Sequence, residues 1–231
     1  MANTRPGLGS TAGFASAATN STISGNLEVG GNSTISGNLE VGGNATVSGN
    51  VTSSGIRATG CVLDVQQTVY EATVALSAPS GGWGSNFSEI DSSFRCSLTP
   101  KSSSNKILAR LVTFVGSGYW TVRGKVQRST DGGSSWTDVG VGTGPIGNRL
   151  PCGFQANRYD AGSAASNIYD VTPVFWEFLD SPNTTSTCTY RVVVAGYLSY
   201  TVTVNTSVAD ANATDQFGRP LSTITLMEIG G

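Results

Sequence analysis

The chain holds few of the side chains with which enzymes carry out acid–base or nucleophilic chemistry. Its 231 residues include no histidine, which removes the commonest general base, the commonest metal ligand and every Ser–His or Cys–His pair. Two carboxylate pairs could be considered for glycoside hydrolysis, Glu177 with Asp180 and Asp160 with Asp170. Nothing in their spacing selects them for that role. We therefore expect no enzymatic activity and no cofactor.

Four cysteines supply the other reactive groups: Cys61, Cys96, Cys152 and Cys188. None lies in a C-x-x-C arrangement, so we expect no metal site. Cys96 and Cys188 each alternate with apolar residues two positions along the chain, which places both on apolar strand faces. The sequence favours buried free thiols at these two positions over the alternative, a disulfide.

Aromatic residues beside turns are the first candidates for ligand binding. Their rings can stack on sugars, and exposed loop tips are where binding residues usually lie. The candidate receptor-binding aromatics are Trp83, Tyr119, Trp120 and Tyr159. The alternative for each of them is a packed position in the core or in an interface.

A run of basic residues is the second candidate for ligand binding. No acid occurs between Asp91 and Asp131, but seven basic residues do: Arg95, Lys101, Lys106, Arg110, Arg123, Lys125 and Arg128. If they line one face, they would suit phosphate- or carboxylate-bearing glycans, with Arg123 and Lys125 as candidate receptor-binding residues. The alternative is a set of solvated positions on alternating strands.

The segment STDGGSSW (129–136) matches the Asp-box pattern Ser-x-Asp-x-Gly-x-x-Trp of sialidase-like propellers. A propeller needs several copies, and the chain has one. We expect a structural hairpin in which Asp131 binds turn amides, the glycines supply unusual backbone angles and Trp136 packs beneath.

These residues must be positioned by two different kinds of structure, and the first is a repeat of period six over residues 21–60. Its hexads read STISGN, LEVGGN, STISGN, LEVGGN, ATVSGN and VTSSGI. The third position predicts a shaft core of Ile23, Val29, Ile35, Val41 and Val47. The fifth and sixth predict corners, because Gly and Asn tolerate left-handed backbone angles: Gly25, Asn26, Gly31, Asn32, Gly37, Asn38, Gly43, Asn44, Gly49 and Asn50.

The number of hexads indicates how many chains form the shaft. A single-chain triangular stack uses three hexads per coil, so six hexads would give two coils, too few to bury a core. Three chains that each contribute one side would form six layers, a shaft of roughly 30 Å. The pattern therefore favours a homotrimeric β-helical shaft over the alternative, a flexible linker.

The second kind of structure begins at Cys61, where short strand-like runs separated by turn residues replace the repeat. We expect strands at 68–76, 105–115, 119–129, 171–179, 187–197, 200–205 and 222–229. No helical pattern competes with them. The sequence predicts an all-β head of sandwich or jelly-roll type over residues 61–231.

One expected strand, 171–179, has two apolar faces. Val174, Trp176 and Phe178 share one face, while Phe175 and Leu179 share the other. Because a surface strand of a monomer normally has a polar face, Phe175 and Leu179 are a candidate subunit interface. The alternative is burial under a loop of the same chain.

Several segments carry a resemblance to a known class of proteins: SLTPKSSSNKIL (97–108), VQRSTDGGSSWTDVG (126–140), LDSPNTTSTCTYRV (179–192), STITLMEIGG (222–231) and the SGNLEVGGN repeat. Together they resemble the fibre and virion structural proteins of tailed phages, marine phages and cyanophages in particular. The heads of those proteins are similar to complement and tumour-necrosis-factor jelly rolls. The resemblance implies a homotrimer and a place on the virion.

From this resemblance we expect a homotrimeric viral fibre anchored by residues 1–20, with a shaft at 21–60 and a receptor-binding head. Its partners would be a tail or capsid protein and a host-surface glycan or protein. A capsid-attached head fibre or decoration protein is the alternative, and a depolymerising tailspike is a third hypothesis. With 13 basic and 15 acidic residues, no signal peptide and no membrane span, we expect cytoplasmic synthesis and no binding to nucleic acid or membrane.

Overall fold

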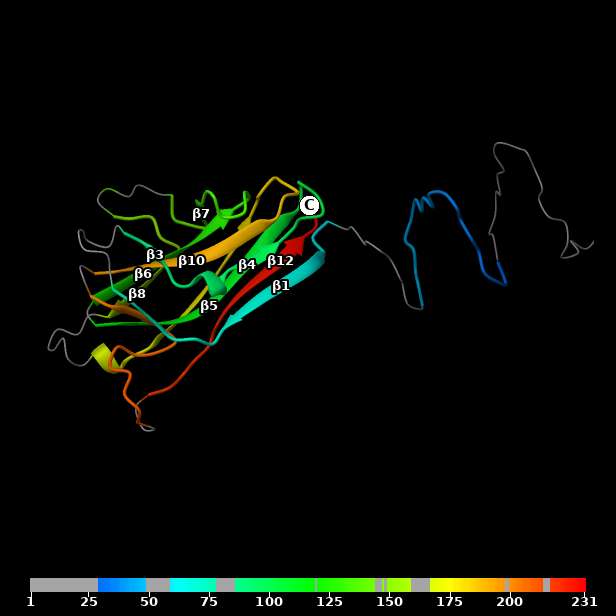
Figure 1. Cartoon of the computed structure of the whole chain (residues 1–231). Helices are drawn as coiled ribbons and strands as arrows, with labels where there is room; N and C mark the ends of the chain where they lie inside the picture. The colour runs from blue at the N-terminus through cyan, green and yellow to red at the C-terminus, as the bar shows by residue number, and fades with distance from the viewer. Residues whose placement is uncertain are drawn as a thin grey trace, which may run out of the picture. The chain divides into compact units, whose positions relative to one another are not determined.

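The structure is a computed structural model that describes residues 29–48, 59–77, 86–118, 120–143, 147, 149–158, 167–197, 200–213 and 217–231. The chain divides into two compact units, Met1–Thr52 and Ser53–Gly231. The boundary thus falls before residue 60, where the repeat was expected to end. The described part of the first unit contains no regular strand, and the second unit is an all-β head (Figure 1).

The described part of the repeat bends with the period of its sequence. Bends fall at 30–31, 36–37, 42–43 and 48, the fourth and fifth positions of the hexads. The assignment of the Gly–Asn pairs to shaft corners stays a prediction, and none of the described repeat residues has a left-handed backbone. The bends use Gly or Ser at the fourth position and Gly at the fifth, where small side chains leave the backbone free to turn.

The apolar positions of the repeat are exposed in the single chain. Val29, Ile35, Val41 and Val47 are between 49% and 59% exposed, and Leu39 is 69% exposed. Ile23, Gly25, Asn26, Gly49 and Asn50 lie outside the described residues, as do residues 1–20.

The head consists of two antiparallel sheets over one core. Sheet A contains β1 (Val62–Tyr70), β2 (Val74–Leu76), β5 (Lys106–Ser117), β9 (Thr172–Asp180), β11 (Val202–Val204) and β12 (Ser222–Ile229). Sheet B contains β3 (Ser88–Glu89), β4 (Cys96–Leu98), β6 (Trp120–Ser129), β7 (Thr137–Val139), β8 (Phe154–Arg158) and β10 (Cys188–Gly196). Two short 3-10 turns, η1 (Ser92–Phe94) and η2 (Asn167–Tyr169), complete the described elements.

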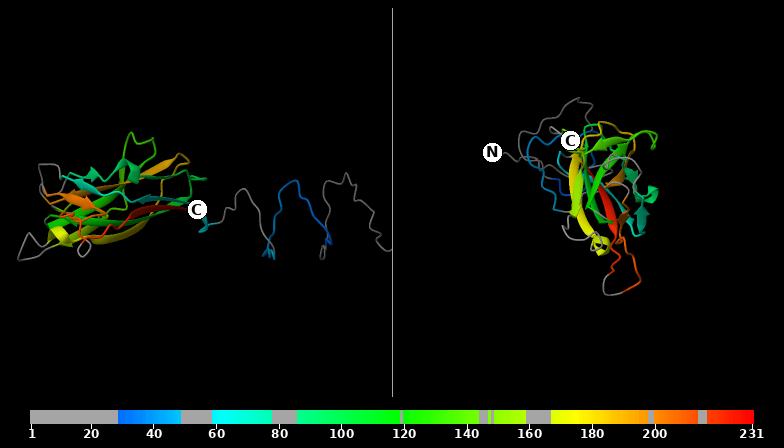
Figure 2. Two further views of the ribbon diagram at one scale, coloured as in Figure 1. Left: turned by 60° about the horizontal axis from the view of Figure 1, so that its bottom comes forward. Right: turned by 90° about the vertical axis from the view of Figure 1, so that its left-hand side faces the viewer.

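Register shows how sheet A is built around its longest strand, β5. One edge of β5 pairs first with β12 and then, further along, with β11, whereas its other edge pairs with β9. β1 and β2 continue the sheet beyond β12 and β11. The two views in Figure 2 show the long strands of the head running beside one another. β9 therefore forms one edge of sheet A.

The seven expected strands are present, with one correction. The segment 68–76 divides at residues 71–73, where the chain changes partner from β12 to β11. The buried side chain of Asn205 holds this break, because its Nδ2 donates to the carbonyls of Tyr70 and Ala72 at 2.8 and 3.0 Å. The short strands β3, β7 and β8 were not predicted, because each has too few residues for an alternation of apolar and polar side chains to be recognised.

Apolar residues from both sheets form one core, in which Leu111, Ile224 and Leu226 of sheet A meet Val192 and Val194 of sheet B. The expectation for two cysteines is confirmed: Cys96 and Cys188 are free and buried. Burial raises the pKa of the Cys188 thiol to about 11.

A buried polar cluster ties the edge strand β9 of sheet A to the inner strands of sheet B. Asp180 at the end of β9 accepts hydrogen bonds from Arg128 of β6 and from the Tyr190 hydroxyl of β10, the latter at 2.7 Å. Burial, together with the charge of Asp180, raises the pKa of Tyr190 well above its ordinary value. Tyr190 therefore stays neutral and acts as a donor.

Glycines let aromatic rings lie directly on the backbone of the head. A Cβ on Gly124 would lie 2.0 Å from the Phe154 ring, and one on Gly140, whose φ is +61°, would lie 2.4 Å from Phe178. We expect Gly124→Ala to lower the free energy of unfolding by about 1–3 kcal/mol through overpacking. Gly140→Ala adds backbone strain to the same clash. The measurement is urea denaturation of both variants.

Gly142→Ala is the matched control, because nothing lies within 4 Å of the added methyl group and its backbone is not left-handed. It should stay within about 0.5 kcal/mol of the wild type. Equal stability of the Gly124→Ala variant and this control would show that the Phe154 ring does not pack as described.

Candidate subunit interface and ligand-binding surfaces

The outer face of sheet A is unusually apolar for an exposed sheet. Along β5 the odd-numbered residues from Ile107 to Val115 point into the core, so the even-numbered ones point outward. Register then defines the apolar face, which consists of Val65, Val69, Leu108, Val112, Phe175, Leu179 and Met227. Phe175 is 72% exposed and Leu179 is 51% exposed, and Val65 and Val69 are about half exposed.

The apolar face is arranged in rows across four strands. Val69, Thr223, Val112 and Phe175 lie side by side in one row. Val65, Met227, Leu108 and Leu179 form a second row in the same way. Between them runs a polar row of Gln67, Thr225, Arg110 and Glu177.

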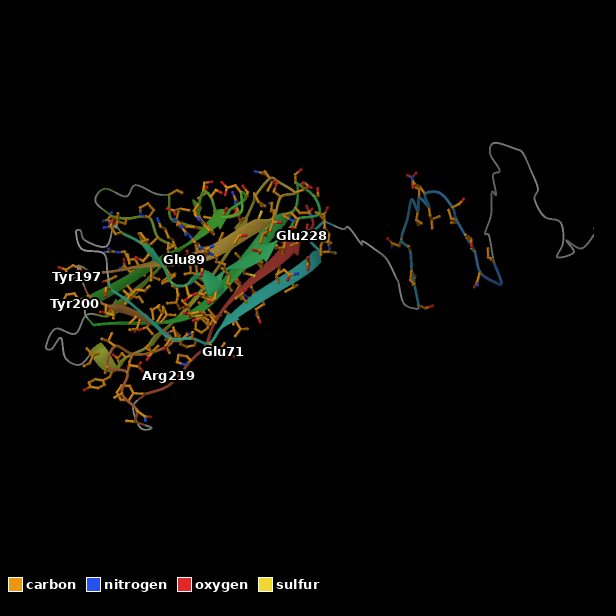
Figure 3. The ribbon with its side chains drawn as sticks, viewed as in Figure 1. Glu71, Glu89, Tyr197, Tyr200, Arg219 and Glu228 are labelled. Carbon is orange, nitrogen blue, oxygen red and sulfur yellow. The ribbon has the colours of Figure 1, made fainter. Side chains whose placement is uncertain are left out.

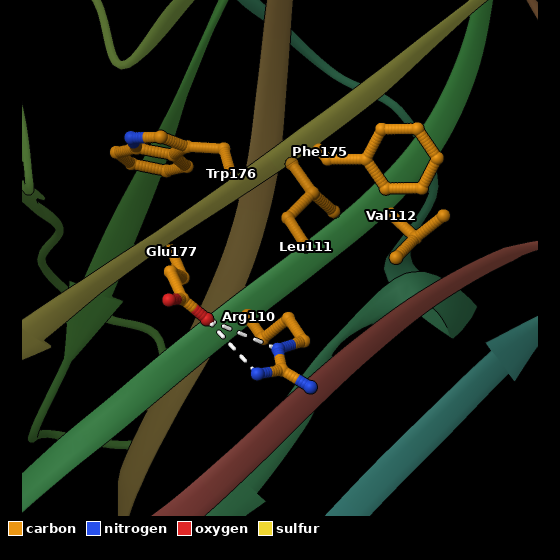
Figure 4. Close-up of a pocket in the computed structure, with 6 residues that line it drawn as sticks. All are labelled: Arg110, Leu111, Val112, Phe175, Trp176 and Glu177. Atoms are coloured by element: carbon orange, nitrogen blue, oxygen red, sulfur yellow. Dashed lines mark hydrogen bonds and ion pairs between the residues drawn. The ribbon is translucent and has the colours of Figure 1, made fainter.

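The polar row satisfies its own hydrogen-bonding groups. Gln67 Nε2 donates to Thr225 Oγ1 at 2.8 Å, and the Arg110 guanidinium contacts Glu177 Oε2 through two nitrogens at 3.1 Å (Figure 4). In Figure 4 the Phe175 and Trp176 side chains point to opposite sides of β9, around a hollow of about 460 Å³. Because its polar groups are paired within the row, the face can be desolvated without leaving a lone charge.

Sequence reasoning singled out only Phe175 and Leu179 on this face. The same signal, alternation of apolar residues on a strand, was available for Val65 and Val69. Leu108 and Met227 gave no such signal, because their strands are apolar on both faces and only the register shows which residues lie beside β9. The assignment of Phe175 and Leu179 to a subunit interface stays a prediction.

The outer face of sheet B is charged instead of apolar. Glu89 pairs with Arg95 at 2.6 Å and with Arg191 at 3.0 Å, and the Arg191 guanidinium lies 4.0 Å from the centre of the Trp136 ring. Burial acts to raise the pKa of Glu89, but the hydrogen bonds and charges of the two arginines outweigh it, so this pKa lies below its ordinary value. Such a face suits contact with solvent.

The seven basic residues do not line one face, so the condition for a single basic patch is not met, and the assignment of Arg123 and Lys125 to receptor binding stays a prediction. Lys106 and Arg110 belong to sheet A, whereas Arg123 and Lys125 lie on the outer face of sheet B and Arg128 points inward to Asp180. Consecutive strands β5 and β6 enter different sheets, which separates residues that are close in sequence. Lys125 is paired with Asp138 at 2.6 Å, and Arg123 donates to Gln155 at 3.1 Å.

Most of the candidate aromatic residues fall outside the described parts of the chain. Trp83, Tyr119 and Tyr159 are not described, and for Trp120 only the backbone is, where it pairs with Arg158 at the start of β6. The expectation for them stays untested.

The carboxylate pairs do not converge on one cleft where they are described. Glu177 lies on the outer face of β9 against Arg110, while Asp180 is turned inward to Arg128. Asp160 is outside the described residues, so its pairing with Asp170 stays untested.

The segment 129–136 folds as the expected hairpin. Asp131 Oδ1 accepts hydrogen bonds from Ser129 Oγ at 2.7 Å and from the Ser135 amide at 2.9 Å. The hydrogen bonds from Ser135, followed by the one from Ser129, hold the pKa of Asp131 well below its ordinary value. Gly132 and Gly133 have φ of +72° and +93°, and Trp136 donates to the Gly133 carbonyl.

No protein-family profile and no curated sequence matches this chain. Within the described ranges, no helix is long and apolar enough to span a membrane. The same ranges contain no group of three or more His, Cys, Asp or Glu residues placed to hold a metal ion.

The lowered pKa of Glu89 predicts a loss of stability in acid. A carboxylate whose folded pKa is depressed contributes stability above its unfolded pKa and loses it as pH falls through the folded value. We expect the melting temperature to fall as pH is lowered below 4.5, the ordinary pKa of Glu89. The measurement is thermal unfolding between pH 7 and pH 3.

Glu89→Gln should melt at a lower temperature than the wild type at pH 7 and approach it in acid, because the variant has no charge to lose there. Glu71→Gln, at an exposed position between β1 and β2, is the matched control. If the gap between the Glu89→Gln variant and the wild type stayed constant with pH, the ion pairs with Arg95 and Arg191 would not be its source.

Proposed function

We propose that this chain is a homotrimeric fibre protein of a tailed-phage virion, anchored by residues 1–20 and presenting its head to the host surface. One observation carries the proposal. Apolar side chains are exposed at the same position of each described hexad, and other apolar side chains are exposed across the outer face of sheet A. Both would be covered if identical chains assembled side by side.

The strand order of the head supports a jelly roll of the expected type. β1, β4, β5, β6, β8, β9, β10 and β12 can be numbered from one to eight in chain order. Sheet A then reads 1-8-3-6 and sheet B reads 2-7-4-5, the order of an eight-stranded jelly roll. The short strands β2, β3, β7 and β11 extend this frame.

The repeat supports assembly of three chains because a single chain leaves its apolar side chains exposed. Each described hexad presents a β-branched residue at its third position and bends after it, yet these residues are about half exposed. Regularly spaced apolar side chains of this kind stabilise an assembly in which neighbouring copies bury them. A triangular shaft with one side from each chain is the arrangement that uses every hexad.

The apolar face is the part of the head that would meet the other two copies. It contrasts with the charged outer face of sheet B, and its central polar row is already paired. The chain enters the head at β1, whose Val65 and Val69 belong to this face. A capsid-attached head fibre would use the same trimer and differ in what residues 1–20 bind.

Light scattering tests the assembly. We expect the purified chain to have a mass of about 71 kDa, three times the 23.7 kDa of one chain. The double variant Phe175→Asp/Leu179→Asp should melt at a lower temperature and dissociate on dilution, because it would bury charges in the interface. Thr137→Asp, at an exposed position of β7 in sheet B, is the matched control and should behave as the wild type.

A monomeric mass for the wild type would contradict the proposal. A trimer that the double variant leaves intact and equally stable would contradict only the role of the apolar face. The position of residues 1–20 in a map of the intact particle distinguishes attachment to the tail from attachment to the capsid.

A further inference from the structure

Register places several loops together at one end of the head, which we call the distal end. β1 begins at Val62, where Gly60 N donates to the Gly230 carbonyl, and its last residue, Tyr70, pairs with Ser222. The segment that leads into β12, the start of β9 and the start of β11 all lie at the Tyr70 end. In Figure 3, Tyr200 and Arg219 accordingly lie far from Glu228.

Aromatic rings are exposed at the distal end but held in place. Tyr169 of η2 is 47% exposed, and its ring packs 6.0 Å from that of Phe217. η2 is fixed by the hydrogen bond from Ala209 N to the Ile168 carbonyl at 2.9 Å. Tyr200, which is 39% exposed, lies with Val208 against Gly118. By contrast, Tyr70 and Tyr190 are buried.

The loops at this end also hold an ion pair in a fixed orientation. The Arg219 guanidinium contacts Asp210 Oδ1, and both groups bind the Thr206 hydroxyl, at 2.6 Å from Arg219 and 2.8 Å to Asp210. The side chains of Arg219 and Asp210 are 54% and 41% exposed. Asp210 adopts a φ of +38°, an uncommon angle for a residue other than glycine. The pair is thus oriented before any ligand arrives.

We propose that Tyr169, Tyr200, Asp210, Phe217 and Arg219 form a distal patch that binds a carbohydrate of the host surface. This inference rests on the proposed fibre function. Tyrosine rings offer flat apolar faces to the C–H side of a sugar, while a carboxylate and a guanidinium accept from and donate to its hydroxyl groups. A carboxylated or phosphorylated sugar would in addition pair with Arg219.

A sugar fits these groups better than a protein partner does. Among the described residues, the patch combines aromatic rings with an exposed ion pair, whereas the centre of a protein interface is depleted of charged residues. The apolar face of sheet A, with its two rows of apolar side chains, suits a protein partner better, and the proposed trimer would occupy it. The distal patch lies at the end of the head opposite to the one at which the chain enters, so it would stay open in such an assembly.

The experiment applies the fluorescently labelled full chain to an array of defined oligosaccharides from bacterial lipopolysaccharides and capsules. The sugar with the strongest signal is then titrated in solution. We expect Tyr169→Ala, Tyr200→Ala and Arg219→Ala each to weaken binding at least ten-fold. Arg123→Ala, on the outer face of sheet B, tests the alternative site in parallel. Thr137→Ala, at an exposed position of β7, is the control and should stay within two-fold. Each variant is first required to keep the mass and melting temperature of the wild type.

Three results would overturn the inference. Unchanged affinity in both tyrosine variants would exclude the distal patch, and loss in the Arg123→Ala variant alone would move the site to sheet B. Binding of whole bacteria by a wild-type chain that binds no sugar of the array would point to a protein receptor. All three leave the trimer in place, whereas a monomeric mass contradicts the fibre itself.

Discussion

The outer face of sheet A presents apolar side chains to solvent, and much of the molecule can be understood from that constraint. A sandwich of two antiparallel sheets normally keeps its outer faces polar. Sheet B follows this rule, with Glu89, Arg95 and Arg191 in one ion-pair network. Sheet A does not, because Phe175 and Leu179 extend outward from its edge strand. In the proposed trimer, the other two copies of the chain would cover this face.

The repeat is subject to the same constraint in a simpler form. Its glycines and serines let the chain bend every six residues, but the described Val and Ile side chains remain about half exposed in the single chain. The repeat and the head thus give two independent reasons for the proposed trimer. The paired polar row on sheet A lowers the cost of burying that face, since Arg110 and Glu177 would enter the interface together.

Inside the head, a few polar groups hold the two sheets together. Asp180, Arg128 and Tyr190 join the edge of sheet A to sheet B, and Asn205 holds the place where the chain changes partner between β1 and β2. The hydrogen bonds of Asn205 also fix the loops of the distal end, since β11 ends next to this residue. A receptor-binding surface built on such loops would be rigid before contact, which limits the entropy lost on binding.

The sequence by itself determined the all-β class, the seven main strands, the period of the repeat and the burial of Cys96 and Cys188, because alternation and turn residues act locally. It also determined the hairpin at Asp131, whose hydrogen bonds all lie within a few residues. Only the tertiary structure decided which strands share a sheet. That decision separated Arg110 from Arg123, joined Phe175 to Val69 through β5 and β12, and brought Tyr169 to Phe217. Such contacts depend on pairing between residues far apart in the chain, which no local pattern encodes.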